Sequence, residues 1–131
     1  EDIEWSGAYQ LKPYPIWDGA VRMKRGMFKS GSYHCLSFHI RKHIPIGKGG
    51  MILTDDKEAS LELKKMSYDG RLPDIPWRDQ NITSKGYHYY MTPETAANGL
   101  KKLPEAIKTK PRKWVITDWP DLTQMEIFKN E

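Results

Sequence analysis

The sequence of 131 residues contains a single cysteine, Cys35, so no disulfide can form within the chain. A lone cysteine inside an apolar stretch is typical of proteins in a reducing compartment, and it predicts a cytoplasmic location. Long apolar runs are missing, because no segment approaches the roughly 18 residues that a membrane span requires, so we expect no membrane partner. The four histidines and the cysteine show no zinc-ligand spacing, and no metal site is expected.

A large excess of charge is missing too, because 21 basic and 17 acidic residues leave a net charge of only +4. Such a small excess favours anionic partners weakly and does not by itself indicate a nucleic-acid ligand. The segment GKGG at residues 47–50 lacks the GxxxxGK[ST] spacing of a phosphate-binding loop, which gives nucleotide hydrolysis little support. What the chain does contain is 38% apolar residues, enough for a globular core in one domain or part of one.

Short apolar runs predict three strands, at residues 14–20, 33–40 and 51–56. The middle strand alternates, with Leu36, Phe38 and Ile40 on one face and Cys35, Ser37 and His39 on the other. Because these strands alternate with helical patterns, we expect an α/β fold with a mainly parallel sheet and flanking helices.

Helical spacing of apolar residues predicts a first helix over residues 1–11, at the start of the chain. This opening already resembles the middle of a helix, which suggests that the natural protein begins further upstream. A second helix is expected over residues 57–66, with Asp55 or Asp56 as its N-cap and Gly70 as its stop.

A third helix is expected over residues 93–103, with Thr92 as N-cap and Pro93 at the first helical position. Between the second and third helices, residues 71–86 carry two prolines and no periodicity, which predicts a long loop. Loops of this length in a compact domain are often functional, so this one is either a binding segment or a disordered connection.

Polar side chains stand where two of the predicted strands end. Asp18 ends the first strand, while Ser37 and His39 end the next, which leads directly to Lys42. In parallel sheets, ligands gather outside the carboxyl ends of the strands. We therefore expect a carboxylate, a hydroxyl and an amine to meet at one edge of the sheet, beside the glycine-rich loop.

Four segments in this order resemble the sugar aminotransferases of the DegT/DnrJ/EryC1/StrS family, which are fold-type I enzymes dependent on pyridoxal 5'-phosphate: SFHIRK, GKGG, the apolar strand ending TDD, and GYHYYMTPETAANGL. The resemblance runs from about Ile3 to Leu103. It implies that residues 1–103 form the second half of the large, cofactor-binding domain of that family. Residues 104–131 would be a basic, aromatic tail in place of a small domain.

The resemblance also implies a role for each candidate residue. Lys42 falls on the lysine that forms a Schiff base with the cofactor, Ser37 on the serine that binds its phosphate, and Asp18 on the aspartate that pairs with the pyridine nitrogen. His88 stands where the family commonly has an asparagine that reaches the cofactor phosphate of the partner subunit. A Schiff base needs an amine that can lose its proton near neutral pH, which basic neighbours of Lys42 favour.

By this resemblance the protein transfers an amino group, with glutamate as donor, to a keto group of a nucleotide-linked sugar. Relatives that dehydrate sugars have histidine in place of the lysine, so Lys42 favours transamination. Active sites in the family are shared by two subunits, which implies a homodimer with residues 71–86 crossing to the partner. The glycine-threonine turn that completes the phosphate site in this family is absent from these 131 residues, so the isolated chain is expected to be inactive.

Two other interpretations remain open from the residues themselves. The basic run at 101–113, near Trp114 and Trp119, could bind nucleic acid or an acidic partner in a non-catalytic module. Charge runs are more often solvated faces, which favours the enzyme. The chain could also be a remnant that keeps the fold without the activity.

Overall fold

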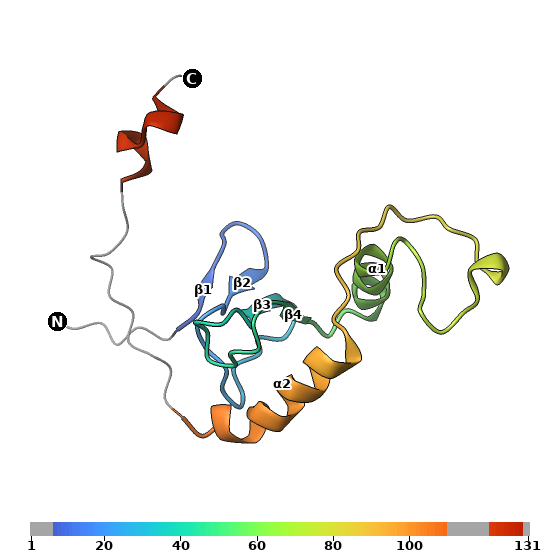
Figure 1. Cartoon of the computed structure of the whole chain (residues 1–131), viewed down its shortest axis with the longest axis horizontal. Coiled ribbons are helices and arrows are strands. Elements are labelled where there is room, and N and C mark those ends of the chain that lie inside the picture. Colours follow the sequence, from blue (N-terminus) through green and yellow to red (C-terminus); the bar gives the residue numbers. More distant parts are fainter. Residues whose placement is uncertain (1–6, 110–120, 130–131) are drawn as a thin grey trace.

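The structure is a computed structural model that describes residues 7–109 and 121–129. Four short strands form one sheet in the order β1-β2-β3-β4: β1 (Tyr9–Gln10), β2 (Ile16–Asp18), β3 (Tyr33–Ser37) and β4 (Gly50–Leu53). The helices are α1 (Lys57–Ser67) and α2 (Pro93–Ala106), with short 3-10 turns η1 (Trp77–Asp79), η3 (Leu122–Gln124) and η4 (Glu126–Phe128). Figure 1 shows α2 running below the sheet and α1 beyond β4, beside the long loop.

The sheet is mixed, so the expectation of a mainly parallel sheet was wrong. Within it β2 and β3 run parallel, whereas β1 and β2, and β3 and β4, are antiparallel. The cause is the loop 38–49, which folds back as a long hairpin: Phe38 N–H donates to Gly49 O at 2.8 Å and Ile40 N–H donates to Gly47 O at 3.0 Å. A parallel neighbour would need a crossover connection, usually a helix, between the two strands.

The helix expected over residues 1–11 is also wrong in the part that the structure describes, because residues 9 and 10 form β1. They pair with Trp17 and Asp18 across a tight turn, in which Leu11 N–H donates to Ile16 O at 2.8 Å. Residues 1–6 lie outside the described part of the chain. Pairing with the following strand, β2, has thus overridden local helical spacing.

The other two helices are confirmed, including their caps. Asp56 accepts a hydrogen bond from Ala59 N–H at the start of α1, and Thr92 accepts one from Thr95 N–H at the start of α2. An irregular segment was expected after Pro104, but helix α2 continues past it to Ala106. The last helical turn is hydrogen-bonded, since Ile107 N–H donates to Leu103 O at 3.1 Å. The expected domain boundary after residue 103 therefore falls inside a helix.

The hydrophobic core lies between β3, the hairpin loop 38–49 and α2. Its buried apolar members among the described residues are Leu36, Phe38, Ile44 and Ala106. Six partly buried side chains pack against them: Met23, Met27, Ile46, Leu53, Met91 and Leu103. The segment that carries Lys42 is therefore anchored on both sides in the best-packed part of the molecule.

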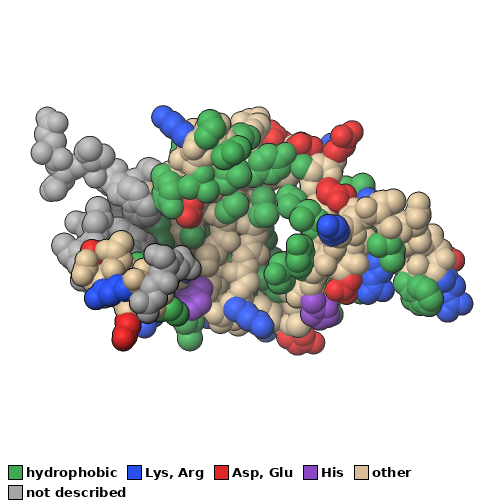
Figure 2. Space-filling model, turned by 90° about the horizontal axis from the view of Figure 1, so that it is seen from above, with side chains coloured by type: hydrophobic (Ala, Val, Ile, Leu, Met, Phe, Trp, Pro, Cys, Tyr) green, Lys and Arg blue, Asp and Glu red, His purple; other side chains and the backbone are tan. Residues whose placement is uncertain are grey.

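Packing is much looser around α1, which buries none of its residues. An open apolar hollow of about 370 Å³ lies between this helix and the sheet, lined in part by Ile16, Cys35, Ile52 and Met66. Many other apolar side chains are exposed, and Figure 2 shows such side chains gathered across one face. Within the described residues, no helix has both the length and the apolar character needed to cross a membrane.

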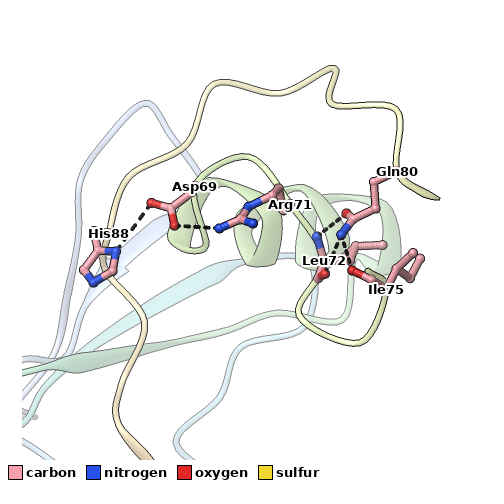
Figure 3. Close-up of polar contacts among 6 residues, drawn as sticks. All are labelled: Asp69, Arg71, Leu72, Ile75, Gln80 and His88. Atoms are coloured by element: carbon pink, nitrogen blue, oxygen red, sulfur yellow. Dashed lines mark hydrogen bonds and ion pairs between the residues drawn. The ribbon is translucent and has the colours of Figure 1, made fainter. Parts of the chain in front are cut away.

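The loop 71–86 is closed at its base by the end of α1. Tyr87 N–H donates to Met66 O at 2.7 Å and Asp69 N–H donates to Tyr87 O at 3.1 Å. Inside the loop, the Gln80 side chain bonds to both backbone groups of Leu72 and to the carbonyl of Ile75 (Figure 3). A surface loop with joined ends and its own internal bonds has the character of an Ω-loop, so the long loop has a defined conformation.

Closure of this loop requires a glycine at position 86. A Cβ there would lie 1.7 Å from Gly70 N, so Gly86→Ala must force the two backbone segments apart. We expect a loss of about 1–3 kcal/mol in the free energy of unfolding, measured by urea denaturation. Gly99→Ala is the control, because its Cβ would meet Ile46 at an ordinary 3.5 Å and the helix should gain up to about 1 kcal/mol. Equal unfolding midpoints for Gly86→Ala and the parent would contradict the described closure.

Candidate functional site

Lys42 lies in a turn of the hairpin loop that follows β3. Its backbone N–H donates to His39 O at 2.8 Å, and the loop is anchored by Phe38 and Ile44, which are 6% and 3% exposed. The Lys42 side chain is half-buried, and its ammonium group has no hydrogen bond or ion pair with any described residue. An amine without such a partner is open to bond with a carbonyl group, which is how lysine forms a Schiff base.

Asp18 ends β2, where it stands opposite Cys35 of the parallel strand β3. Both carboxylate oxygens are held: Oδ2 accepts from the Tyr9 hydroxyl at 2.9 Å, and Oδ1 accepts from Ala20 N–H at 2.8 Å. The hydrogen bond to Asp18, and then its charge, raise the pKa of Tyr9. Sequence reasoning missed Tyr9, which it placed in a helix.

Ser37 is the last residue of β3 and stands opposite Gly50 of β4. It lies two residues beyond Cys35, so Asp18 and Ser37 both occupy carboxyl ends of the parallel pair. Its hydroxyl accepts a long hydrogen bond of 3.4 Å from His39 N–H, which leaves the hydroxyl proton available to a ligand. Because β3 leads into the loop of Lys42, all three predicted groups belong to this end of the sheet.

His88 is placed elsewhere, beside the end of α1. It forms an isolated bridge with Tyr68, and its side chain is 73% exposed. Its Nδ1 lies 3.5 Å from Asp69, whose other oxygen accepts from Arg71 at 3.2 Å (Figure 3). Among the described residues, its contacts include none with Asp18, Ser37 or Lys42, so the chain does not itself join His88 to the other candidates.

A buried histidine underlies the same end of the sheet. His34 of β3 is 1% exposed, and neither ring nitrogen has a partner among the described residues. Burial lowers its pKa, the charge of Lys29 lowers it further, and Asp18 acts in the opposite direction. A Cβ at Gly19 would lie 2.4 Å from His34 Nε2, so the glycine after Asp18 makes room for this ring. The strand alternation already put residue 34 on the face of Leu36, and that signal could have identified it.

A second histidine, His43, connects the loop of Lys42 to two other segments. Its Nδ1 accepts from Met23 N–H at 3.0 Å, and its Nε2 lies 2.8 Å from Thr109 Oγ1. Burial lowers the pKa of His43, against the effect of a hydrogen bond to the Ala106 backbone. A histidine with a lowered pKa stabilises the fold fully above its usual 6.5, and loses that contribution as the pH falls through the lowered value.

A family model agrees with the motifs that the sequence showed. The model of the DegT/DnrJ/EryC1/StrS aminotransferase family matches residues 19–118 of the 131-residue chain. The match contains Ser37, Lys42 and His88, and it begins one residue after Asp18. No curated protein sequence and no solved structure matches the chain significantly. Because the family model covers well over half of the residues, the chain belongs to the DegT/DnrJ/EryC1/StrS aminotransferase family.

Proposed function

We propose that this chain contributes the cofactor-binding lysine of an aminotransferase that moves an amino group from glutamate to the keto group of a nucleotide-linked sugar. Its family consists of aminotransferases, which generally depend on pyridoxal phosphate. The observation that carries the proposal is Lys42, whose backbone is fixed by the core while its amine has no partner among the described residues. A cytoplasmic enzyme of this kind also agrees with the single cysteine.

The chemistry of the three side chains fits pyridoxal phosphate. The Lys42 amine would hold it covalently, the Ser37 hydroxyl would donate to a phosphate oxygen, and the Asp18 carboxylate would accept from the protonated ring nitrogen. When bound, the cofactor supplies an electron sink for the substrate carbon that loses its proton. Tyr9 and Ala20 already orient the Asp18 carboxylate, so little reorganisation is needed when it takes up its charged partner.

Lys42 would also have a role in proton transfer. Its amine would take a proton at Nζ from the substrate carbon as general base and return one as general acid. The adjacent Phe38 and Ile44 are buried, which keeps this loop close to the dry core. A lysine at this position, where dehydrating relatives have histidine, supports transamination.

Two half-reactions test the proposed activity separately. The full-length protein loaded with pyridoxal phosphate should convert ¹⁵N-labelled glutamate to 2-oxoglutarate in a single turnover, which establishes the amino donor. A panel of nucleotide-linked keto sugars and free keto sugars should then show ¹⁵N transfer to the nucleotide-linked members. Transfer to free sugars or keto acids alone would overturn the substrate class, and absence of any 2-oxoglutarate would overturn glutamate as donor.

We also propose that the active site is shared between two copies of this chain. His88 is exposed and makes no described contact with the other candidates, so it is available to the cofactor phosphate of the partner subunit. The loop that precedes it exposes Ile75, Trp77 and Ile82, at 41%, 66% and 52%. Several large apolar side chains exposed on one loop are unusual on a monomer and favour a contact with a second copy.

A dimer is therefore the expected state in solution, measured by light scattering and sedimentation. Trp77→Ser, which removes an exposed ring, should weaken the dimer and lower cofactor affinity together, because His88 acts across the interface. Lys85→Ser, in the same loop, is the control for a change that removes no apolar surface. A stable monomer with full cofactor affinity at high concentration would contradict the shared site.

The alternative of a basic binding module is not favoured. Lys102, one of the basic residues in the run 101–113, already has a partner inside the protein: its Nζ donates to Pro45 O at 2.7 Å. This bond ties α2 to the loop of Lys42 and leaves that ammonium group less available to a phosphate. Residues 110–113, Trp114 and Trp119 lie outside the described part of the chain.

A further inference from the structure

The ring of His43 joins three segments that are far apart in sequence. Met23 N–H, 20 residues earlier, donates to its Nδ1 at 3.0 Å, and Thr109 Oγ1, 66 residues later, lies 2.8 Å from its Nε2. Thr109 in turn donates from its hydroxyl to Ala106 O at 3.1 Å, at the end of α2. One imidazole therefore links the turn after β2, the Lys42 loop and the carboxyl end of α2.

These contacts fix the tautomer of His43. Because Nδ1 accepts from a backbone N–H, it cannot carry a proton, and the neutral ring must carry its proton on Nε2. Nε2–H then donates to Thr109 Oγ1, whose own proton is directed to Ala106 O. The Ala106 carbonyl, whose hydrogen bond also acts to raise the pKa of His43, is the final acceptor, so the hydrogen bonds are mutually consistent and run in one direction.

The hydrogen bonds of His43 restrain the loop next to Lys42. His43 directly follows Lys42, and Ile44, next along the chain, is 3% exposed in the core. Two bonded ring nitrogens and one buried side chain therefore hold the two residues after Lys42. On the other side, the bond from Lys42 N–H to His39 O holds the turn that precedes it.

We propose that His43 is a positioning residue for Lys42, clamping the loop between Met23 and Thr109 so that the lysine amine meets the cofactor in one orientation. The proposal rests on the proposed function, in which Lys42 carries pyridoxal phosphate. Misplacement of a reacting group by about 1 Å can cost about a hundredfold in rate. Loss of the clamp should therefore slow covalent capture at Lys42 without removing the amine itself.

Four variants of the protein separate the two bonds. His43→Phe keeps the ring shape and loses both bonds, while His43→Asn places an amide oxygen near the position of Nδ1 and keeps the bond from Met23 alone. Thr109→Val removes the hydroxyl at nearly constant volume, and Thr109→Ser retains it as the matched control. Amide hydrogen exchange at Met23 reports the first bond without any cofactor: protection should be lost in His43→Phe and kept in His43→Asn.

The second readout is the ratio of labelling at two lysines of one loop, interpreted together with the unfolding temperature. Each variant is exposed briefly to pyridoxal phosphate and reduced with borohydride, and the labelling of Lys42 is divided by that of Lys48 in the same loop. We expect the ratio to fall about 10- to 100-fold in His43→Phe and Thr109→Val, and to stay at the parent value in Thr109→Ser. Unfolding temperatures measured alongside identify any variant whose fold is lost, since unfolding labels both lysines alike.

The outcomes separate the positioning role of His43 from the cofactor role of Lys42. A parent labelled at Lys42, with an unchanged ratio in His43→Phe and Thr109→Val, overturns the positioning role and leaves the proposed function standing. A protected Met23 amide with no labelling at Lys42 of the parent overturns the proposed function, and the positioning role with it. A reduced ratio that Thr109→Ser restores supports both.

Discussion

Lys42→Ala should abolish amino transfer, lowering the rate by at least about a thousandfold. The substitution removes the covalent link to the cofactor and also the group that moves the proton, and general acid–base catalysis alone contributes about 10²–10⁴-fold. The fold should survive, because the Lys42 ammonium has no partner among the described residues and the adjacent core residues are unchanged. Single-turnover conversion of glutamate, with unfolding temperature measured in parallel, checks both statements.

The matched control is Lys48→Ala, in the same loop. Lys48 is exposed and lies beyond the core residues that hold Lys42, so its removal should leave the rate within about twofold of the parent. A large loss in Lys48→Ala, with activity kept in Lys42→Ala, would transfer the cofactor role to the other lysine. Added methylamine offers a further check, since a small amine should partly restore turnover only where the missing group is the catalytic amine.

Asp18→Asn should lower turnover by about a hundredfold or more while the cofactor stays bound. An uncharged amide cannot hold a proton on the ring nitrogen, and removing one well-placed electrostatic partner commonly costs about 10²–10³-fold. Ser37 and Lys42 would still bind the cofactor, so its affinity should change much less than the rate. Turnover and cofactor affinity, measured on the same preparation, separate the two effects.

Tyr9→Phe is the control for this prediction, because it removes the hydroxyl that bonds to Asp18 Oδ2 and keeps the carboxylate. The bond from Ala20 N–H to Oδ1 remains, so the orientation of Asp18 should be only partly relaxed and the rate should fall a few-fold at most. Unchanged turnover in Asp18→Asn would mean that Asp18 serves simply to form the turn after β2.

Local features of the fold could be predicted from the sequence because local forces decide them. Thr92 and Asp56 cap their helices with their own side chains, and each cap involves atoms within three residues. The strand direction was not predictable in this way. Whether β4 lies parallel or antiparallel to β3 depends on how loop 38–49 closes, and its glycines allow closure without showing which backbone groups will pair.

The candidate site likewise contains residues that short-range patterns predict and residues that only the folded chain brings together. Asp18, Ser37 and Lys42 stand at strand ends, or just beyond one, where short-range patterns and family motifs both indicate them. The contact of His43 with Thr109 joins residues that are 66 positions apart, so no short-range sequence pattern could indicate it. Tyr9 was missed for a related reason: its bond to Asp18 depends on the pairing of β1 with β2, which overrode the helical spacing around it.

The most direct test of the account is the identity of the lysine that binds the cofactor. The full-length protein is incubated with pyridoxal phosphate and reduced with borohydride, and the modified peptide is identified by mass spectrometry. We predict a single major adduct on Lys42, and none at that level in Lys42→Ala. An adduct on Lys48 that persists in Lys42→Ala, or no specific adduct on either lysine, would contradict the central claim.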